Sequence, residues 1–206
     1  MCDVAAGRLW RWRFDAATGT LAPGEPAFTA LPEGVAPHDL VFRPDGRFAY
    51  AVSGKTSKIA AFAYDAAGGG LTDLQTISTL PEYFDGPNTA GELGIHPTGK
   101  YLYVSNLGHD SVVLLGIEAE KGTLSFVEEQ GTGGRTPRHF GIEPSAKHLA
   151  IANQDSDTVL VCRIDAGNGR LKPSGVFASV PSPIFVRFLP PPEASPAAAA
   201  PPAARR

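Results

Sequence analysis

Ionisable side chains recur in three short segments of this sequence, each at the same distance before a proline or an equivalent turn residue. A carboxylate can activate water as a general base, and a histidine can transfer protons near neutral pH. An arginine can bind an anion or stabilise an oxyanion. If the fold brings the segments together, we expect Glu92, Arg138 and His38 to be catalytic. The segments are His38-Asp39, Gly91-Glu92 and Arg138-His139.

A second set of polar residues follows or precedes these segments and is a candidate for binding a substrate. Each member also has a structural interpretation. Asn106 and Asn153 occupy equivalent places where asparagine often caps a turn, and Asp3 and Ser53 at the same place favour that role. For Glu92 and Arg138 the structural alternative is an ion pair between neighbouring elements. The candidate binding residues are Asn88, Asn106, His109, His139, Asn153 and Gln154.

Other kinds of chemical site have no support in the sequence. Gly68-Gly69-Gly70 is not followed by Lys-Ser or Lys-Thr, so it indicates a hairpin loop and not a phosphate loop. There is no metal-ligand spacing and no Gly-x-Ser-x-Gly nucleophile motif. We therefore predict neither a metal nor a cofactor.

An internal repeat supplies the elements that must position these residues. The turns at Pro44, Pro97 and Pro144 are 53 and 47 residues apart, which is typical of a propeller with four strands per blade. A second motif, Asp/Glu-x-x-x-Gly-x-Leu, has the residue types of a hairpin loop, with a carboxylate to accept backbone N–H groups and a glycine for positive φ. It begins at Asp15, Asp65, Glu118 and Asp165.

The repeat predicts an all-β fold, a β-propeller of four-stranded antiparallel blades. Each blade runs from an inner strand beside the central channel to an outer strand, and the expected inner strands are Asp39–Arg43, Glu92–His96 and His139–Glu143. The expected blade edges are 3–36, 37–89, 90–136 and 137–182, followed by a closing inner strand at 183–189. The propeller thus occupies 1–190, and the Pro/Ala-rich tail at 191–206 is predicted to be disordered.

Composition narrows the functional class. The 206 residues are 43% hydrophobic and 19% charged, and the net charge of −3 is too balanced for a dedicated binder of nucleic acid or membrane surfaces. The apolar runs are too short to span a membrane, and the first residues lack a signal-peptide pattern. Two distant cysteines suit a reducing compartment, so we expect a cytoplasmic protein.

Four longer motifs carry a resemblance to a known family. They are the segments 88–92, 103–111, 133–138 and 152–156, which read NTAGE, YVSNLGHDS, GGRTPR and ANQDS. As a set they resemble the lactonase-type seven-bladed β-propellers, which include bacterial 6-phosphogluconolactonases and fungal carboxymuconate-cyclising enzymes. The resemblance covers about residues 3–189, the C-terminal half of that family, or about three and a half blades of a seven-bladed ring. Leu107 stands where the family motif usually has arginine.

This resemblance implies a lactone hydrolase that converts 6-phospho-D-glucono-1,5-lactone to 6-phosphogluconate in the pentose phosphate pathway, without a metal. Its partner would be the small sugar-lactone substrate. Two alternatives stay open: a muconolactone-type cycloisomerase, and a catalytically inactive truncated propeller or interaction module. Unprotected blade edges near Trp10, Trp12, Ile184 and Phe185 also predict self-association.

Overall fold

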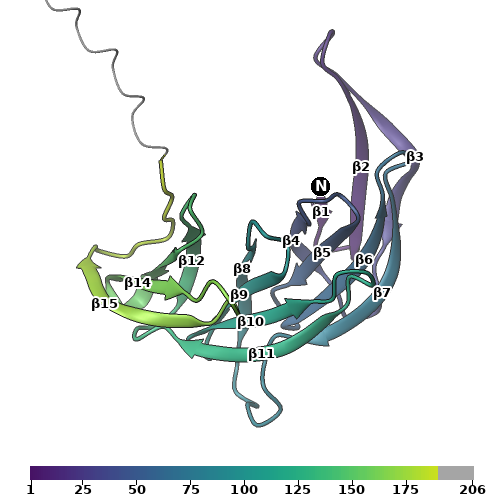
Figure 1. Cartoon of the computed structure of the whole chain (residues 1–206). Helices are drawn as coiled ribbons and strands as arrows, with labels where there is room; N and C mark the ends of the chain where they lie inside the picture. Colours follow the sequence, from purple (N-terminus) through teal and green to yellow (C-terminus); the bar gives the residue numbers. More distant parts are fainter. Residues whose placement is uncertain (190–206) are drawn as a thin grey trace, which may run out of the picture.

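The computed structural model describes residues 1–189, and within them the fold is built almost wholly from antiparallel strands (Figure 1). One short 3-10 helix, Gln154–Ser156, is the exception. The tail at 191–206 for which we predict disorder lies outside the described residues.

Four sheets follow one another along the chain, and we call them blades 1 to 4. Blade 1 has three strands and the others have four, each in the sequential order of a meander. The predicted all-β propeller with four-stranded antiparallel blades is therefore confirmed. The strands are β1 (Cys2–Asp3), β2 (Arg8–Asp15) and β3 (Thr20–Ala30); β4 (Pro37–Phe42), β5 (Phe48–Ser53), β6 (Lys58–Asp65) and β7 (Gly70–Ser78); β8 (Thr89–Ile95), β9 (Tyr101–Leu107), β10 (Ser111–Ile117) and β11 (Leu124–Gly131); and β12 (Pro137–Ile142), β13 (His148–Asn153), β14 (Thr158–Ile164) and β15 (Leu171–Ser179).

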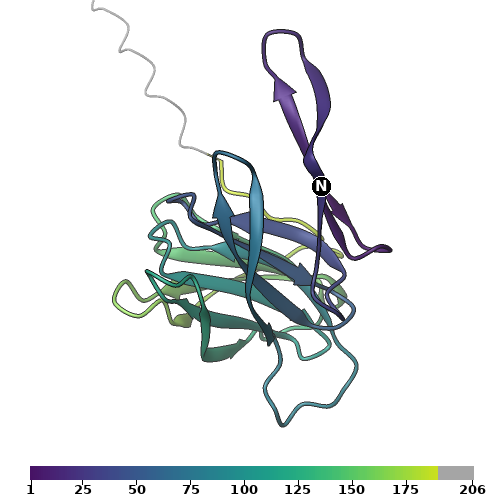
Figure 2. The ribbon, with the colours of Figure 1, turned by 90° about the vertical axis from the view of Figure 1, so that its right-hand side faces the viewer.

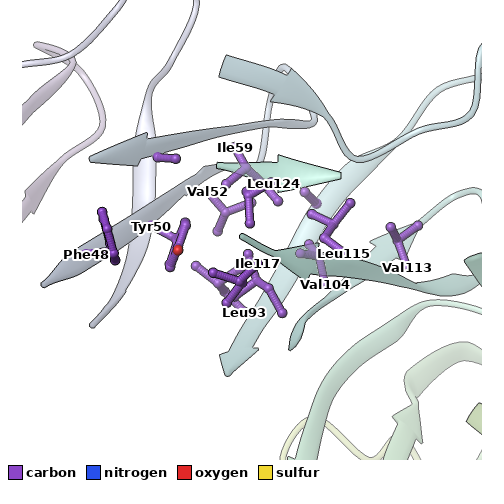
Figure 3. Close-up of a cluster of buried hydrophobic side chains, with 13 residues drawn as sticks. Phe48, Tyr50, Val52, Ile59, Leu93, Val104, Val113, Leu115, Ile117 and Leu124 are labelled. Carbon is purple, nitrogen blue, oxygen red and sulfur yellow. The ribbon is translucent and has the colours of Figure 1, made fainter. Parts of the chain in front are cut away.

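The blades stack face to face, and their apolar side chains fill the spaces between them. The largest cluster lies between blades 2 and 3 and includes Tyr50, Val104 and Leu115 (Figure 3). A second cluster joins blades 3 and 4, and a third joins blades 1 and 2. Every residue of β5 is buried, because a middle strand is covered on both faces by the adjacent blades. In Figure 2 the β2–β3 hairpin extends beyond the other blades.

The repeated acidic turns adopt the predicted hairpin geometry. In each, the carboxylate at the first position accepts a hydrogen bond from the backbone N–H two residues later, as from Ala17 to Asp15 and from Gly167 to Asp165. The glycine of each turn has a positive φ, from 69° at Gly122 to 73° at Gly169. This region of backbone conformation favours glycine. The motif therefore ends the third strand and starts the outer one.

Two buried tyrosines connect neighbouring blades through these turns. Tyr50 of blade 2 donates to the carbonyl oxygen of Gly122 in blade 3 at 3.0 Å, and Tyr103 of blade 3 donates to Gly169 in blade 4 at 2.7 Å. Both contacts occupy the same place in the repeat. They orient each blade relative to the next, and so orient the inner strands of neighbouring blades.

The last described segment differs from its prediction. Residues 183–189 are not a strand, because they form no ladder of backbone hydrogen bonds with any described strand, and a strand exists only through such pairing. The segment instead lies along β12, where a Cβ on Gly141 would come within 3.0 Å of the Val186 carbonyl oxygen.

Candidate functional site

Each complete blade has a β-bulge near the start of its inner strand, and the bulges aim the candidate site residues. The register skips His38 in β4, Arg138 in β12, and one position at Gly91-Glu92 in β8. An extra residue in one strand bends it and reorients the side chains beside it. As a result, two consecutive residues of each inner strand line the same pocket. The inner strands themselves begin two or three residues earlier than predicted.

The pocket has a volume of about 700 Å³ and lies at the inner ends of all four blades. Its ionisable lining residues are His38, Asp39, Lys55, Glu92, Arg138 and His139. All three predicted catalytic residues are thus in one pocket, together with the predicted binding residue His139. Ile184 and Phe185 of the final segment complete one side of it.

Glu92 and His139 form the central contact of the pocket. The Nε2 atom of His139 lies 3.5 Å from Oε2 of Glu92. Burial, with a smaller contribution from the Asp39 carboxylate, raises the pKa of Glu92 to about 7. Burial also lowers the pKa of His139, against the opposing effect of Asp39. Both shifts favour the neutral forms, so the contact is a carboxyl–imidazole pair able to exchange a proton near neutral pH and not a fixed ion pair.

Two pocket residues are absent from the candidates predicted by the sequence. Asp39 precedes its proline by the same distance as Glu92 and His139, so the repeat places these three side chains at one level of three adjacent blades. Lys55 lies in the turn after β5 and is exposed. The repeat offered a signal for Asp39, whereas nothing in the spacing distinguished Lys55 from an ordinary turn lysine.

The two remaining catalytic candidates differ in how they are held. The Nε2 atom of His38 lies 2.9 Å from the Gly91 carbonyl oxygen, which can only accept, so Nε2 carries the proton and Nδ1 is left as an acceptor. Arg138 is exposed and forms no ion pair with any residue of the described chain, in contrast to the alternative of a structural pair with Glu92. Its guanidinium is therefore available to an anion.

Asn88, Asn106 and His109 lie in a hydrogen-bonded cluster beside the pocket and not in its lining. Asn106 is fully buried and donates to the Thr79 carbonyl oxygen at 2.8 Å, while its own oxygen accepts from Asn88. Asn88 also accepts the backbone N–H of His109, whose ring packs on Phe84. These contacts match the structural interpretation of the asparagines, because they join the connection after β7 to blade 3.

Asn153 and Gln154 occupy the corresponding places in blade 4. Asn153 is fully buried and donates to the Thr132 carbonyl oxygen at 3.0 Å, as Asn106 does to Thr79. Gln154 corresponds in the repeat to Leu107, which does line the pocket, but Gln154 itself does not. The structure therefore separates the nine candidate residues into four in the pocket and five around it.

Leu107 fills space that the adjacent bulge leaves open. A Cβ on Gly91 would lie 2.5 Å from a Leu107 methyl carbon and 2.6 Å from the Ser105 hydroxyl oxygen. A larger residue at position 91 would therefore make the Leu107 and Ser105 side chains shift. Leu107 makes this part of the pocket lining apolar. The cationic groups of the pocket are those of Lys55 and Arg138.

The described residues include no group of three or more His, Cys, Asp or Glu side chains placed to hold a metal ion. Among residues 1–189 there is also no helix of the length and apolar character needed to cross a membrane.

Comparison with known proteins gives consistent matches. A family model described as lactonase, 7-bladed beta-propeller, matches residues 1–188. An uncharacterised Lactococcus lactis protein is 41% identical over 80 residues, which are 39% of this chain and 24% of that protein. The 6-phosphogluconolactonase of Bacillus subtilis is 29% identical over 94 residues, which are 46% of this chain and 27% of that enzyme.

A solved structure extends the similarity to nearly the whole described chain. The periplasmic gluconolactonase of Pseudomonas aeruginosa superposes with a TM-score of 0.84 and 33% identity, covering 92% of this chain and 53% of that one. The chain therefore spans about half the length of this relative. Since the family model matches almost all of the described residues, the chain belongs to the lactonase family of seven-bladed β-propellers.

Proposed function

We propose that this chain carries the site of a lactone hydrolase of the 6-phosphogluconolactonase type. The observation that supports this most is the Glu92–His139 pair, a carboxyl group with a pKa of about 7 next to an imidazole in a pocket that also holds Arg138. A general base works best when its pKa lies near the operating pH.

The arrangement suits the two steps of lactone hydrolysis. Glu92, as a carboxylate, takes a proton from the water that attacks the lactone carbonyl carbon. Arg138 stabilises the negative charge that develops on the carbonyl oxygen. His38 orients the attacking water through its accepting Nδ1 atom. The bond from the carbonyl carbon to the ring oxygen then breaks, and the Glu92–His139 pair returns the proton to the ring oxygen. The product is the open-chain hydroxy acid.

The charge of the pocket supports a phosphorylated substrate. Lys55 and Arg138 are exposed cations in its lining, with no ion pair to any described residue. Guanidinium and ammonium groups are the usual protein ligands of phosphate. A muconolactone carries carboxylates in place of the phosphate. Comparing the rates of the chain on the two kinds of lactone therefore separates a hydrolase from a cycloisomerase.

Substrate preference tests this proposal. The wild-type chain should hydrolyse 6-phosphoglucono-1,5-lactone faster than glucono-1,5-lactone or muconolactone. Arg138→Ala should lower kcat/KM for the phosphorylated lactone by roughly tenfold to a hundredfold, the loss of one charge-assisted contact. Arg163→Ala, on the exposed part of β14, is the matched control. An Arg138→Ala chain that unfolds, or that treats all three lactones as the wild type does, would refute the assignment.

We also propose that the reaction belongs to the pentose phosphate pathway in the cytoplasm. The Bacillus relative is named as a 6-phosphogluconolactonase, while the solved Pseudomonas relative is named as a periplasmic gluconolactonase. Cell fractionation of the native protein, alongside cytoplasmic and secreted marker enzymes, distinguishes the two locations.

A second copy of this chain is the partner that we propose for its open ends. Phe14 and Leu21 on blade 1 are 67% and 61% exposed, and Ile184 and Phe185 on the final segment are each 60% exposed. Among the described residues, blade 1 has no inner strand beyond β1, and the segment 183–189 has no strand partner. We propose that these two surfaces pair between copies.

A further inference from the structure

The segment from Ser182 to Leu189 follows a fixed course along blade 4. The backbone N–H of Val180 donates to the Asp157 carbonyl oxygen at 2.9 Å, and that of Ser182 donates to the Asp157 carboxylate at 2.7 Å. Further along, the absence of a side chain at Gly141 lets the backbone at Val186 approach β12 closely. These contacts bring the segment to the side of the pocket where His139 lies.

The segment contacts His139 in two ways. The Phe185 ring packs against the imidazole with 4.2 Å between the ring centres. The backbone N–H of Val186 points at Nδ1 of His139, with 3.4 Å between the two nitrogens. Because a backbone N–H can only donate, Nδ1 must be the unprotonated, accepting nitrogen. The proton of the neutral ring is therefore on Nε2.

That proton faces the catalytic carboxyl group. Nε2 is the nitrogen that lies 3.5 Å from Oε2 of Glu92. A proton on Nδ1 would instead meet the Val186 N–H and leave Nε2 with a lone pair toward the carboxylate. The segment thus determines which of the two nitrogens can donate to Glu92.

Charged groups surround this pair from several elements. Asp39 on β4 acts on both Glu92 and His139, and it opposes the effect of burial on the imidazole. His38 and Lys55 come from blade 2 and Arg138 from β12 itself, while Arg187 follows Val186 on the segment. The Val186 contact acts in the same direction as burial, since protonated His139 would turn a second N–H toward the Val186 N–H.

We propose that Val186 is a positioning residue: its backbone N–H holds His139 in the tautomer that donates from Nε2 to Glu92. The catalytic consequence rests on the function proposed above, whereas the tautomer itself does not. The segment therefore does more than line the pocket, because it determines which ring nitrogen of His139 carries the proton.

A matched pair of substitutions isolates the backbone N–H. Val186→Pro removes this donor, and Val186→Ala keeps it while removing most of the side chain. Proline is a mild change here, since 183–189 is neither helix nor strand and already begins with Pro183. Nitrogen-15 NMR of the imidazoles reports the tautomer of each of the five histidines, and His139→Gln assigns the His139 signals.

The wild type and Val186→Ala should show His139 predominantly as the Nε2–H tautomer above its pKa. Val186→Pro should raise the Nδ1–H population about fivefold, the change expected for losing one hydrogen bond. It should also lower kcat about tenfold and move the pH optimum, with KM unchanged. An Nδ1–H tautomer in the wild type, or equal tautomer ratios in the Pro and Ala variants, would overturn the proposal.

The two readouts separate this proposal from the proposed function. A tautomer shift in a chain that hydrolyses no lactone supports the positioning role and refutes the hydrolase. Lactone hydrolysis with no tautomer difference between the variants supports the hydrolase and refutes the positioning role. If Val186→Pro fails to fold, an Nδ1–H tautomer of His139 in the wild type still overturns the proposal.

Discussion

Glu92 is the residue whose environment departs furthest from that of an ordinary surface carboxylate in this pocket. Burial first, and the Asp39 carboxylate second, raise the pKa of Glu92 from its usual 4.5 to about 7. A raised pKa in the folded state means that the folded chain binds this proton more tightly than the unfolded chain does. The associated stability is present below about pH 4.5 and is lost as the pH rises through about 7.

Replacing Glu92 with glutamine should remove this pH dependence. Relative to the wild type, Glu92→Gln should become progressively more stable between about pH 5 and pH 8, by at most about 3 kcal/mol for a shift of this size. Urea unfolding followed at several pH values measures the difference. Glu82→Gln, at an exposed position outside the pocket lining, is the control substitution. A constant difference between Glu92→Gln and the wild type would mean that Glu92 ionises normally.

For single residues, the sequence predicted which side chains line the pocket better than it predicted which side chains contact one another. The repeat indicated that His38, Glu92 and Arg138 begin equivalent inner strands, and all three line the pocket. It did not predict the contact between the Glu92 carboxyl group and the His139 imidazole. The repeat determines where a residue lies along its strand, but not the side-chain rotamer. The sequence also did not predict which polar side chains are buried. Asn106 and Asn153 have the residue type and place of turn caps, yet both are fully buried and form hydrogen bonds between blades.

At the scale of the elements, the strand–turn repeat predicts the middle and third strands almost to the residue. The apolar runs at 48–53, 111–117, 148–153 and 158–164 coincide with β5, β10, β13 and β14, since runs bounded by turns leave little freedom. The inner strands were less predictable, because a bulge breaks their alternation. The final segment failed as a strand because strand formation depends on a partner edge, which is a property of the assembly and not of the segment.

The repeated tyrosine contacts give an element-scale prediction. Tyr103 donates to the buried Gly169 carbonyl oxygen, whereas the bond from Tyr101 to Gly167 is exposed. Tyr103→Phe should therefore lower the free energy of unfolding by roughly 1 to roughly 2 kcal/mol, the cost of leaving a buried acceptor without its donor. Tyr101→Phe should change it by less than about 0.5 kcal/mol, as is usual for an exposed site. Chemical denaturation of both variants makes the comparison. Equal losses would show that burial of the bond contributes nothing to the docking of blades 3 and 4.

At the level of the whole molecule, the exposed apolar residues at the open ends determine the oligomeric state that we expect. Exposed apolar faces of this kind promote association, and the proposal of a second copy predicts a dimer or larger species. Light scattering coupled to size-exclusion chromatography should give a mass above that of one chain. The double variant Phe14→Glu and Phe185→Glu should shift the mass toward one chain, whereas Phe126→Glu, exposed on β11 away from both ends, should not. A wild-type monomer at all concentrations would contradict the proposal.

We propose that the pocket performs lactone hydrolysis through Glu92. The most direct measurement is the rate of 6-phosphoglucono-1,5-lactone opening by the purified chain, corrected for spontaneous hydrolysis and followed across the size-exclusion peak. We predict a wild-type rate well above background and a loss of about a hundredfold or more in Glu92→Gln, as expected when a general base is removed. A wild-type rate equal to background would show that the chain is not a lactone hydrolase, and a Glu92→Gln rate equal to that of the wild type would show that Glu92 is not its general base.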